Sequence, residues 1–128
     1  MDIYDIIGFV AEKYDCTFKH ENDYVLLEWY STAGRDVCFE FDPETENKDV
    51  VEILDDLVYN YDVNYETYIW LDNFGHGGKG APEDIREILE DSEEILETLK
   101  YIVIDVKLIK DYLDYSGVGE NITKKSME

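Results

Sequence analysis

Cysteine and histidine are scarce in this 128-residue chain, and their scarcity excludes several kinds of site. Cys16 and Cys38 are the only cysteines, too few for a disulfide framework or a four-ligand zinc site. This usage is typical of a reducing cytoplasm, and we expect both thiols to lie in or near the core. His20 and His76 stand in no HExxH or similar spacing, and there is no nucleophile elbow. The sequence therefore predicts a protein that is not an enzyme and that binds no metal or cofactor.

Long apolar runs are also missing. The most apolar stretch, residues 101–109, is short and contains Asp105 and Lys107. The opening residues MDIYDIIGF carry no basic segment. We therefore expect neither a membrane-spanning helix nor a signal peptide.

Basic residues are the third shortage, with 11 Lys and Arg against 32 Asp and Glu and a formal charge of −21. Because DNA, RNA and anionic membranes would repel such a charge, we expect no direct binding to them. A cationic partner protein is the natural complement. The alternative is that the acidity serves solubility or salt adaptation alone. With 45% hydrophobic residues, including 11 Tyr, the charge belongs to a folded surface and not to a disordered tail.

Hydrophobic spacing predicts an α+β fold that begins with a helix and a three-stranded antiparallel meander. Residues 3–14 repeat apolar side chains at helical spacing, with acidic residues at the positive end of the helix dipole. Three period-two runs follow, at 16–20, 25–29 and 37–41, separated by turn signals. The predicted sheet has one apolar face, which needs a covering layer of helices.

The remainder of the chain is predicted to be helical. Residues 50–58 return to helical spacing, with Asn47 as a candidate cap, and 61–74 holds enough apolar surface for a short helix. Over 85–113, apolar residues alternate spacings of three and four. This pattern predicts a long C-terminal amphipathic helix, either continuous or kinked near 101–106.

We expect one domain, residues 1–117, with a sub-boundary at the glycine-rich turn 75–80 and a frayed tail at 118–128. The turn sequence, GHGGKG, resembles a phosphate-binding P-loop only in part. Asn73 stands where that motif needs its first Gly, and Gly80 where it needs Ser or Thr. We interpret it as a turn between helices.

A first acidic cluster lies between residues 36 and 66, where eleven carboxylates face a single basic residue, Lys48. The strand at 37–41 is expected to place its acids opposite its apolar face. The helix at 50–58 is expected to place its acids away from its apolar stripe. Together these acids predict one negative ridge. The candidate partner-binding residues of this cluster are Asp36, Glu40, Asp42, Glu44, Glu46, Asp49, Glu52, Asp55 and Asp56.

A second acidic cluster, at 83–97, opens the long helix and is opposed only by Arg86. Neighbours on one helix face lie about 5 to 6 Å apart, so a carboxylate on every turn is a sparser version of the charge row of a nucleic acid. The alternative is an ordinary solvated helix face. The candidate partner-binding residues here are Glu87, Glu90, Asp91 and Glu94.

The order of the elements over residues 1–74, together with the acidity, resembles the small anti-CRISPR proteins that inhibit type II CRISPR nucleases by imitating DNA. The local matches are Asp5-Ile6-Ile7 at the start of the first helix, Thr17 and Lys19 in the first strand, and Gly34 and Asp36 in the second hairpin. Thr32 and Ala33 stand where that family has Asn and Asp, and the chain from Gly75 onward has no counterpart. What the resemblance implies is a class, a phage-type inhibitor that mimics nucleic acid.

We therefore expect an acidic inhibitor that occupies the basic groove of a nucleic-acid-binding protein, with a CRISPR effector or a restriction enzyme favoured. An immunity or antitoxin protein that neutralises a basic nuclease toxin would use the same surface for the same reason. An acidic scaffold protein is the third interpretation. Charge reports the sign of a partner and not its identity, so all three stay open here.

Overall fold

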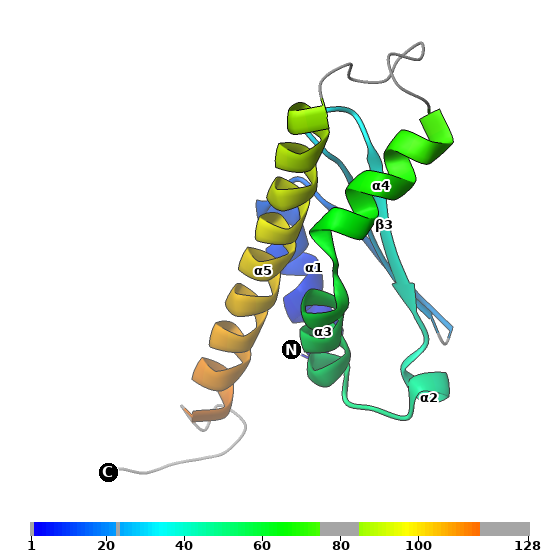
Figure 1. Ribbon diagram of the computed structural model, residues 1–128. Helices are drawn as coiled ribbons and strands as arrows, with labels where there is room; N and C mark the ends of the chain where they lie inside the picture. The colour runs from blue at the N-terminus through cyan, green and yellow to red at the C-terminus, as the bar shows by residue number, and fades with distance from the viewer. Residues whose placement is uncertain (1, 23, 75–84, 116–128) are drawn as a thin grey trace.

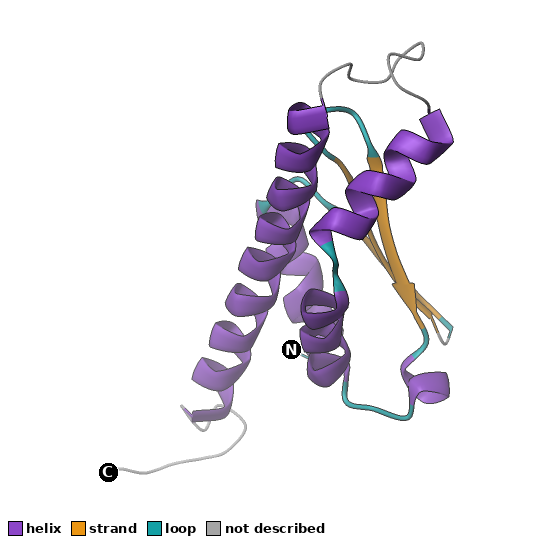
Figure 2. Cartoon of the chain, viewed as in Figure 1, coloured by secondary structure: helices purple, strands orange, loops and turns teal. Residues whose placement is uncertain are grey.

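The computed structural model describes residues 2–22, 24–74 and 85–115 (Figure 1). A helix, a three-stranded antiparallel sheet and further helices follow one another along the chain, which confirms the predicted α+β class. Apart from one short helix near the end of the strands, the helices lie on one side of the sheet, as the colouring by secondary structure shows (Figure 2). The predicted sub-boundary at 75–80 and the tail at 118–128 fall outside the described residues.

The first helix, α1 (Ile3–Lys13), begins at a capping box. The Asp2 carboxylate accepts a hydrogen bond from the Asp5 N–H at 2.9 Å, and the Asp5 carboxylate accepts one from the Asp2 N–H at 3.0 Å. This reciprocal pair satisfies two backbone donors that a helix start leaves without partners. The buried residues of α1 are Ile6, Ile7, Val10 and Ala11.

The sheet has the strand order β1-β2-β3, and both pairs are antiparallel. Its strands are β1 (Thr17–Glu21), β2 (Tyr24–Tyr30) and β3 (Asp36–Phe41). Leu27 of the central strand pairs with Phe18 on one side and Phe39 on the other. Residues that pair in this way share a face, so the apolar sides of all three strands point to the helices. The predicted meander is confirmed.

A one-turn helix, α2 (Pro43–Glu46), follows the sheet and was not predicted. The Asp42 side chain caps its first turn, and proline at the first helical position favours the helical φ angle. Asn47 ends α2 in the left-handed conformation, at φ 54°. The prediction that Asn47 caps the next helix is therefore wrong. Asp49 caps that helix, α3 (Val50–Asn60).

The last two helices are α4 (Val63–Phe74) and α5 (Ile85–Tyr115). The α4 helix confirms the short helix predicted within 61–74. The α5 helix is continuous over 31 residues, about 46 Å, with no kink at 101–106. Ile102, Val103 and Val106 of this segment pack into the core, which outweighs their weak helix propensity. In Figure 1, α5 runs the length of the molecule and α4 lies against its first half.

The hydrophobic core joins α1, α3 and α5 to the inner face of the sheet. Leu54 of α3 and Leu99 of α5 are among its most enclosed side chains. The Cys16 side chain packs beside this core, and its burial raises the pKa of its thiol to about 11. Cys38 is exposed, so the prediction that both thiols are in or near the core is wrong for this one. It alternates with Val37 on β3 and therefore faces outward.

Candidate functional site

The outward face of β3 carries the first carboxylates of the predicted ridge. Asp36 and Glu40 are exposed, whereas Val37 and Phe41, which alternate with them, are buried. The alternation that the sequence predicts for this strand is therefore confirmed. Both acids lie on β3, which is an edge strand of the described sheet.

A carboxylate of the central strand, Glu28, joins Asp36 on this face. Their contact raises the pKa of Glu28, chiefly through a hydrogen bond with Asp36 and then through repulsion between the two charges. The sequence prediction did not include Glu28. Its position between Leu27 and Trp29, both buried, is the signal that it faces outward.

Two acids of the first cluster serve as helix caps. The Asp42 carboxylate accepts hydrogen bonds from the N–H groups of Glu44 and Thr45, at 2.9 and 3.3 Å. The Asp49 carboxylate accepts one from the Val51 N–H at 2.9 Å. Each bond satisfies a donor at a helix start, so these side chains stabilise the fold whether or not they meet a partner.

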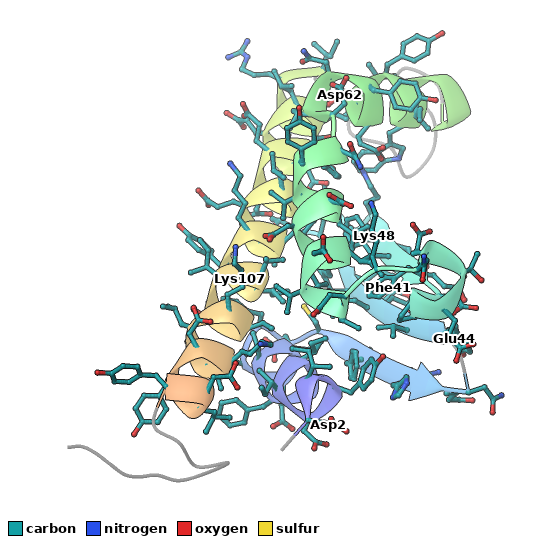
Figure 3. All side chains as sticks on the ribbon, turned by 90° about the horizontal axis from the view of Figure 1, so that it is seen from below. Asp2, Phe41, Glu44, Lys48, Asp62 and Lys107 are labelled. Atoms are coloured by element: carbon teal, nitrogen blue, oxygen red, sulfur yellow. The ribbon has the colours of Figure 1, made fainter. Side chains whose placement is uncertain are left out.

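Two further acids of this cluster are held in ion pairs. The Asp55 carboxylate lies 3.2 Å from the Lys107 ammonium of α5, and that of Asp56 lies 2.6 Å from the Lys48 ammonium. Figure 3 shows the two lysines on opposite flanks of α3. Asp56 raises the pKa of Lys48 through its hydrogen bond and its charge. The charge of these two acids is thus partly neutralised within the chain.

The structure gathers acids from four elements around one hollow of about 390 Å³. Glu40 of β3, Glu46 of α2, Asp56 of α3 and Glu66 of α4 line it, together with Lys48. Glu44 and Glu52 are exposed on α2 and α3, and no ion pair within the described residues involves them. The acids of this hollow, together with Glu44 and Glu52, form one candidate surface, which we call the α2–α3 surface.

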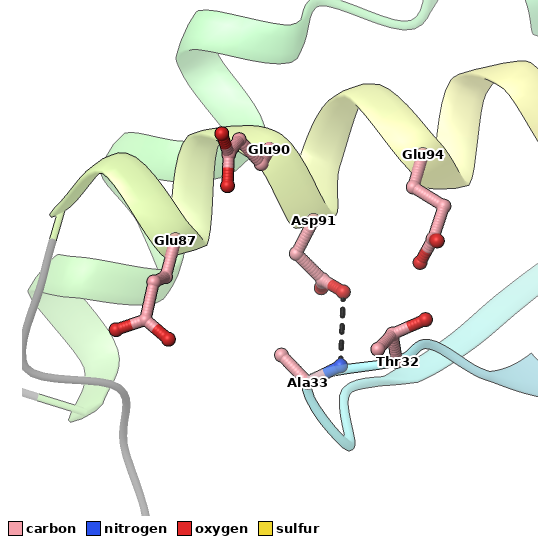
Figure 4. Close-up of a pocket in the computed structure, with 6 residues that line it drawn as sticks. All are labelled: Thr32, Ala33, Glu87, Glu90, Asp91 and Glu94. Carbon is pink, nitrogen blue, oxygen red and sulfur yellow. Dashed lines mark hydrogen bonds between the residues drawn. The ribbon is translucent and has the colours of Figure 1, made fainter.

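The second cluster lies on the first half of α5. Glu87, Glu90 and Glu94 are exposed. They line a hollow of about 310 Å³ together with Thr32 and Ala33 of the hairpin between β2 and β3. In Figure 4, the Glu87 and Glu94 side chains point to the same side of α5 as the hairpin. We call this the α5 acidic surface.

Asp91 is buried and so is not one of the exposed acids expected on this helix face, although it lines the same hollow. Its side chain is only 2% exposed. It accepts hydrogen bonds from the Ser31 hydroxyl at 2.7 Å and the Ala33 N–H at 3.0 Å (Figure 4). The helix places Asp91 toward the sheet because it lies three and four residues from Ile88 and Ile95, both buried.

Arg35 continues this buried polar network from the hairpin to α4 and α5. Its Nε atom lies 3.8 Å from the Asp91 carboxylate, and its guanidinium donates a hydrogen bond to the Ser92 hydroxyl at 3.0 Å. The guanidinium also lies over the Trp70 ring, 4.2 Å from its centroid. The Thr67 hydroxyl donates a hydrogen bond to that of Ser92 at 2.9 Å. The network therefore holds the hairpin, α4 and α5 together beneath the α5 acidic surface.

The described residues show no metal-binding arrangement. Among them, no three or more His, Cys, Asp or Glu side chains are grouped so that they could hold an ion. His20 stacks on the Tyr4 ring, with 3.6 Å between ring centroids. None of the described helices combines the length and the hydrophobicity needed to cross a membrane.

Comparison with known proteins gives no relative. No protein-family model, curated protein or solved structure matches this chain.

Proposed function

We propose that this protein is an inhibitor that mimics nucleic acid and occupies the basic groove of a nucleic-acid-binding protein. A CRISPR effector or a restriction enzyme of the cytoplasm is the favoured target, because of the resemblance over residues 1–74. The observation that carries the proposal is the placement of exposed carboxylates. They occupy both the α2–α3 surface and the α5 acidic surface.

The spacing on α5 supports mimicry of a charged backbone. Glu87, Glu90, Glu94 and Glu97 are exposed and follow each other by three or four residues. At 1.5 Å per residue they place a charge about every 5 Å along the helix axis, against about 3.4 Å along one strand of duplex DNA. Lys and Arg side chains that bind phosphates are long enough to reach this line of carboxylates.

The proposal is tested by competition. A purified CRISPR nuclease with its guide RNA, and separately a restriction enzyme, would be loaded with fluorescent duplex DNA and titrated with the protein at several salt concentrations. We expect displacement of DNA that weakens steeply with salt, because both ligands neutralise the same basic residues. A stable ternary complex, or displacement indifferent to salt, would contradict mimicry. Inhibition of a basic nuclease toxin without displacement from either enzyme would favour an immunity protein.

A further inference from the structure

The outer face of the second half of α5 is apolar although it is exposed. It carries five large side chains that follow each other by three or four residues and therefore lie in one line. Their exposed fractions run from 48% to 93%. We call this line the outer stripe, and its members are Tyr101, Ile104, Leu108, Tyr112 and Tyr115.

The fold does not need the outer stripe to bury α5. The opposite face of the helix supplies Ile95, Leu99, Ile102 and Val106, each exposed by 1% or less. That face packs against α1, α3 and the sheet. Only Tyr101 of the outer stripe has a ring contact, with Tyr14 at 6.5 Å, among the described residues. A line of exposed apolar side chains on a helix that is already anchored marks an interaction site.

The outer stripe continues the α5 acidic surface. From Glu87 through Glu90, Glu94 and Glu97 to Tyr101, each step along the chain is again three or four residues. Because α5 is continuous, this spacing places the carboxylates and the apolar side chains along one side of a single straight helix. A partner that lies along α5 would contact the glutamates on its first half and the apolar side chains on its second half.

The net negative charge of the molecule favours a basic partner over a second copy of the chain at the outer stripe. Two copies of a chain with a formal charge of −21 repel one another, which opposes pairing of two outer stripes. A basic segment is attracted by the same charges. We infer that the outer stripe binds an amphipathic segment of the basic partner, with apolar side chains on one face and Lys or Arg beside them. This inference rests on the proposed function, which supplies a basic partner.

The two halves of α5 would contribute differently to such a complex. The glutamates steer the basic partner and raise the association rate, an effect that salt screens. Burial of the outer stripe is insensitive to screening and slows dissociation. A purely phosphate-like mimic lacks the second contribution.

The probe is a synthetic helical peptide of leucine and lysine, about 18 residues and about 27 Å long, with leucine at positions i, i+3, i+4 and i+7. A scrambled peptide of the same composition keeps the charge and removes the apolar face. The variant is I104Q/L108Q/Y112Q. The matched control, Y59Q/Y65Q/Y68Q, removes three other exposed apolar side chains, from α3 and α4. Glutamine keeps helix propensity high, and circular dichroism and Tm check the fold.

We expect the wild-type protein and the control variant to bind the patterned peptide at least about tenfold more tightly than the scrambled one. The I104Q/L108Q/Y112Q variant should bind both peptides alike, with the salt dependence unchanged. Equal binding of both peptides by the wild type, or discrimination that survives in the variant, would overturn the inference. So would wild-type dimers in sedimentation that the variant abolishes. No nucleic-acid-binding enzyme enters this assay, so its failure is separate from failure of the displacement experiment.

Discussion

The Asp91 carboxylate of α5 accepts a hydrogen bond from the Ala33 N–H at 3.0 Å, which ties the long helix to the hairpin between β2 and β3. The same carboxylate lies 3.8 Å from Nε of Arg35, whose side chain is only 14% exposed. Removing a carboxylate that is buried in this way leaves its charged and hydrogen-bonded partners buried and unpaired, which destabilises the fold.

Asp91→Ala should therefore lower the free energy of unfolding by about 2 to 4 kcal/mol, because it leaves the nearly buried Arg35 guanidinium without its counter-charge and the Ser31 hydroxyl and Ala33 N–H without their acceptor. Chemical denaturation measures this loss. Glu94→Ala, one turn further along α5 and exposed, is the control and should change stability by about 0.5 kcal/mol or less. If Asp91→Ala changed the free energy of unfolding no more than Glu94→Ala does, the Asp91 network would not contribute to stability.

Partner binding and folding should separate within the first acidic cluster. The triple variant E44Q/E46Q/E52Q removes exposed charges and should weaken association with the target, while stability stays equal or rises as repulsion is relieved. Asp42→Ala and Asp49→Ala remove helix caps and should each cost about 1 kcal/mol. Displacement assays measure the binding of each variant, and thermal melts on the same samples measure its stability. Parallel loss of binding and Tm in the triple variant would mean that those glutamates are structural.

Repulsion between the Glu28 and Asp36 carboxylates should lower the stability of the fold at neutral pH, and this loss should shrink in acid. Asp36 raises the pKa of Glu28, so the folded state holds that proton more tightly than the unfolded state does. The pair therefore opposes folding at neutral pH, and this effect fades as the pH falls through the raised pKa. Glu28→Gln should raise Tm at neutral pH, and its advantage over the wild type should shrink on acidification. Glu12→Gln, an exposed acid on α1 with no such partner pair in the described chain, is a suitable control. An advantage for Glu28→Gln that is constant with pH would contradict the pairing.

Asp105 should behave in the opposite sense. A hydrogen bond from the Tyr14 hydroxyl at 2.7 Å, and another from the Lys13 ammonium at 3.1 Å, lower the pKa of its carboxyl. Its stabilising contribution is complete above the pKa of the unfolded chain and is lost as the pH falls through the lowered folded value. Asp105→Asn should cost about 1 kcal/mol at neutral pH, a figure reduced by the exposure of the site, and nothing in strong acid. Tyr14→Phe should reproduce part of the loss. Denaturation of all three proteins across a pH series provides the measurement.

Local patterns in the sequence predict the helices and strands well because each depends on neighbours along the chain. The alternation in β3 and the three-four spacing of α5 indicate both the element and its buried face. The four-residue α2 is too short to show a period, so only its Asp42-Pro43 start could indicate it. That α5 is continuous could not be read from its spacing, because burial of the segment near Val103 overrides helix propensity.

The site was harder to predict because its charges find partners across the fold. Asp91 belongs to the same acidic run as Glu90, and nothing in the local sequence indicates that Arg35 lies beside it. Likewise Lys107 neutralises Asp55 from another helix. Composition gives the sign of a surface, but tertiary packing decides which carboxylates remain available to a partner.

The strand order β1-β2-β3 leaves β3 as an edge. We expect its exposed Asp36 and Glu40 to form an electrostatic barrier to fibril growth. An unpaired strand edge is a template for strands of other molecules, and like charges keep two such edges apart. Near the isoelectric point of about 4.1 the carboxylates lose much of their charge and the barrier falls. Turbidity and thioflavin fluorescence should therefore rise there, and we expect the acidity of this strand to protect the folded chain from β-aggregation at neutral pH.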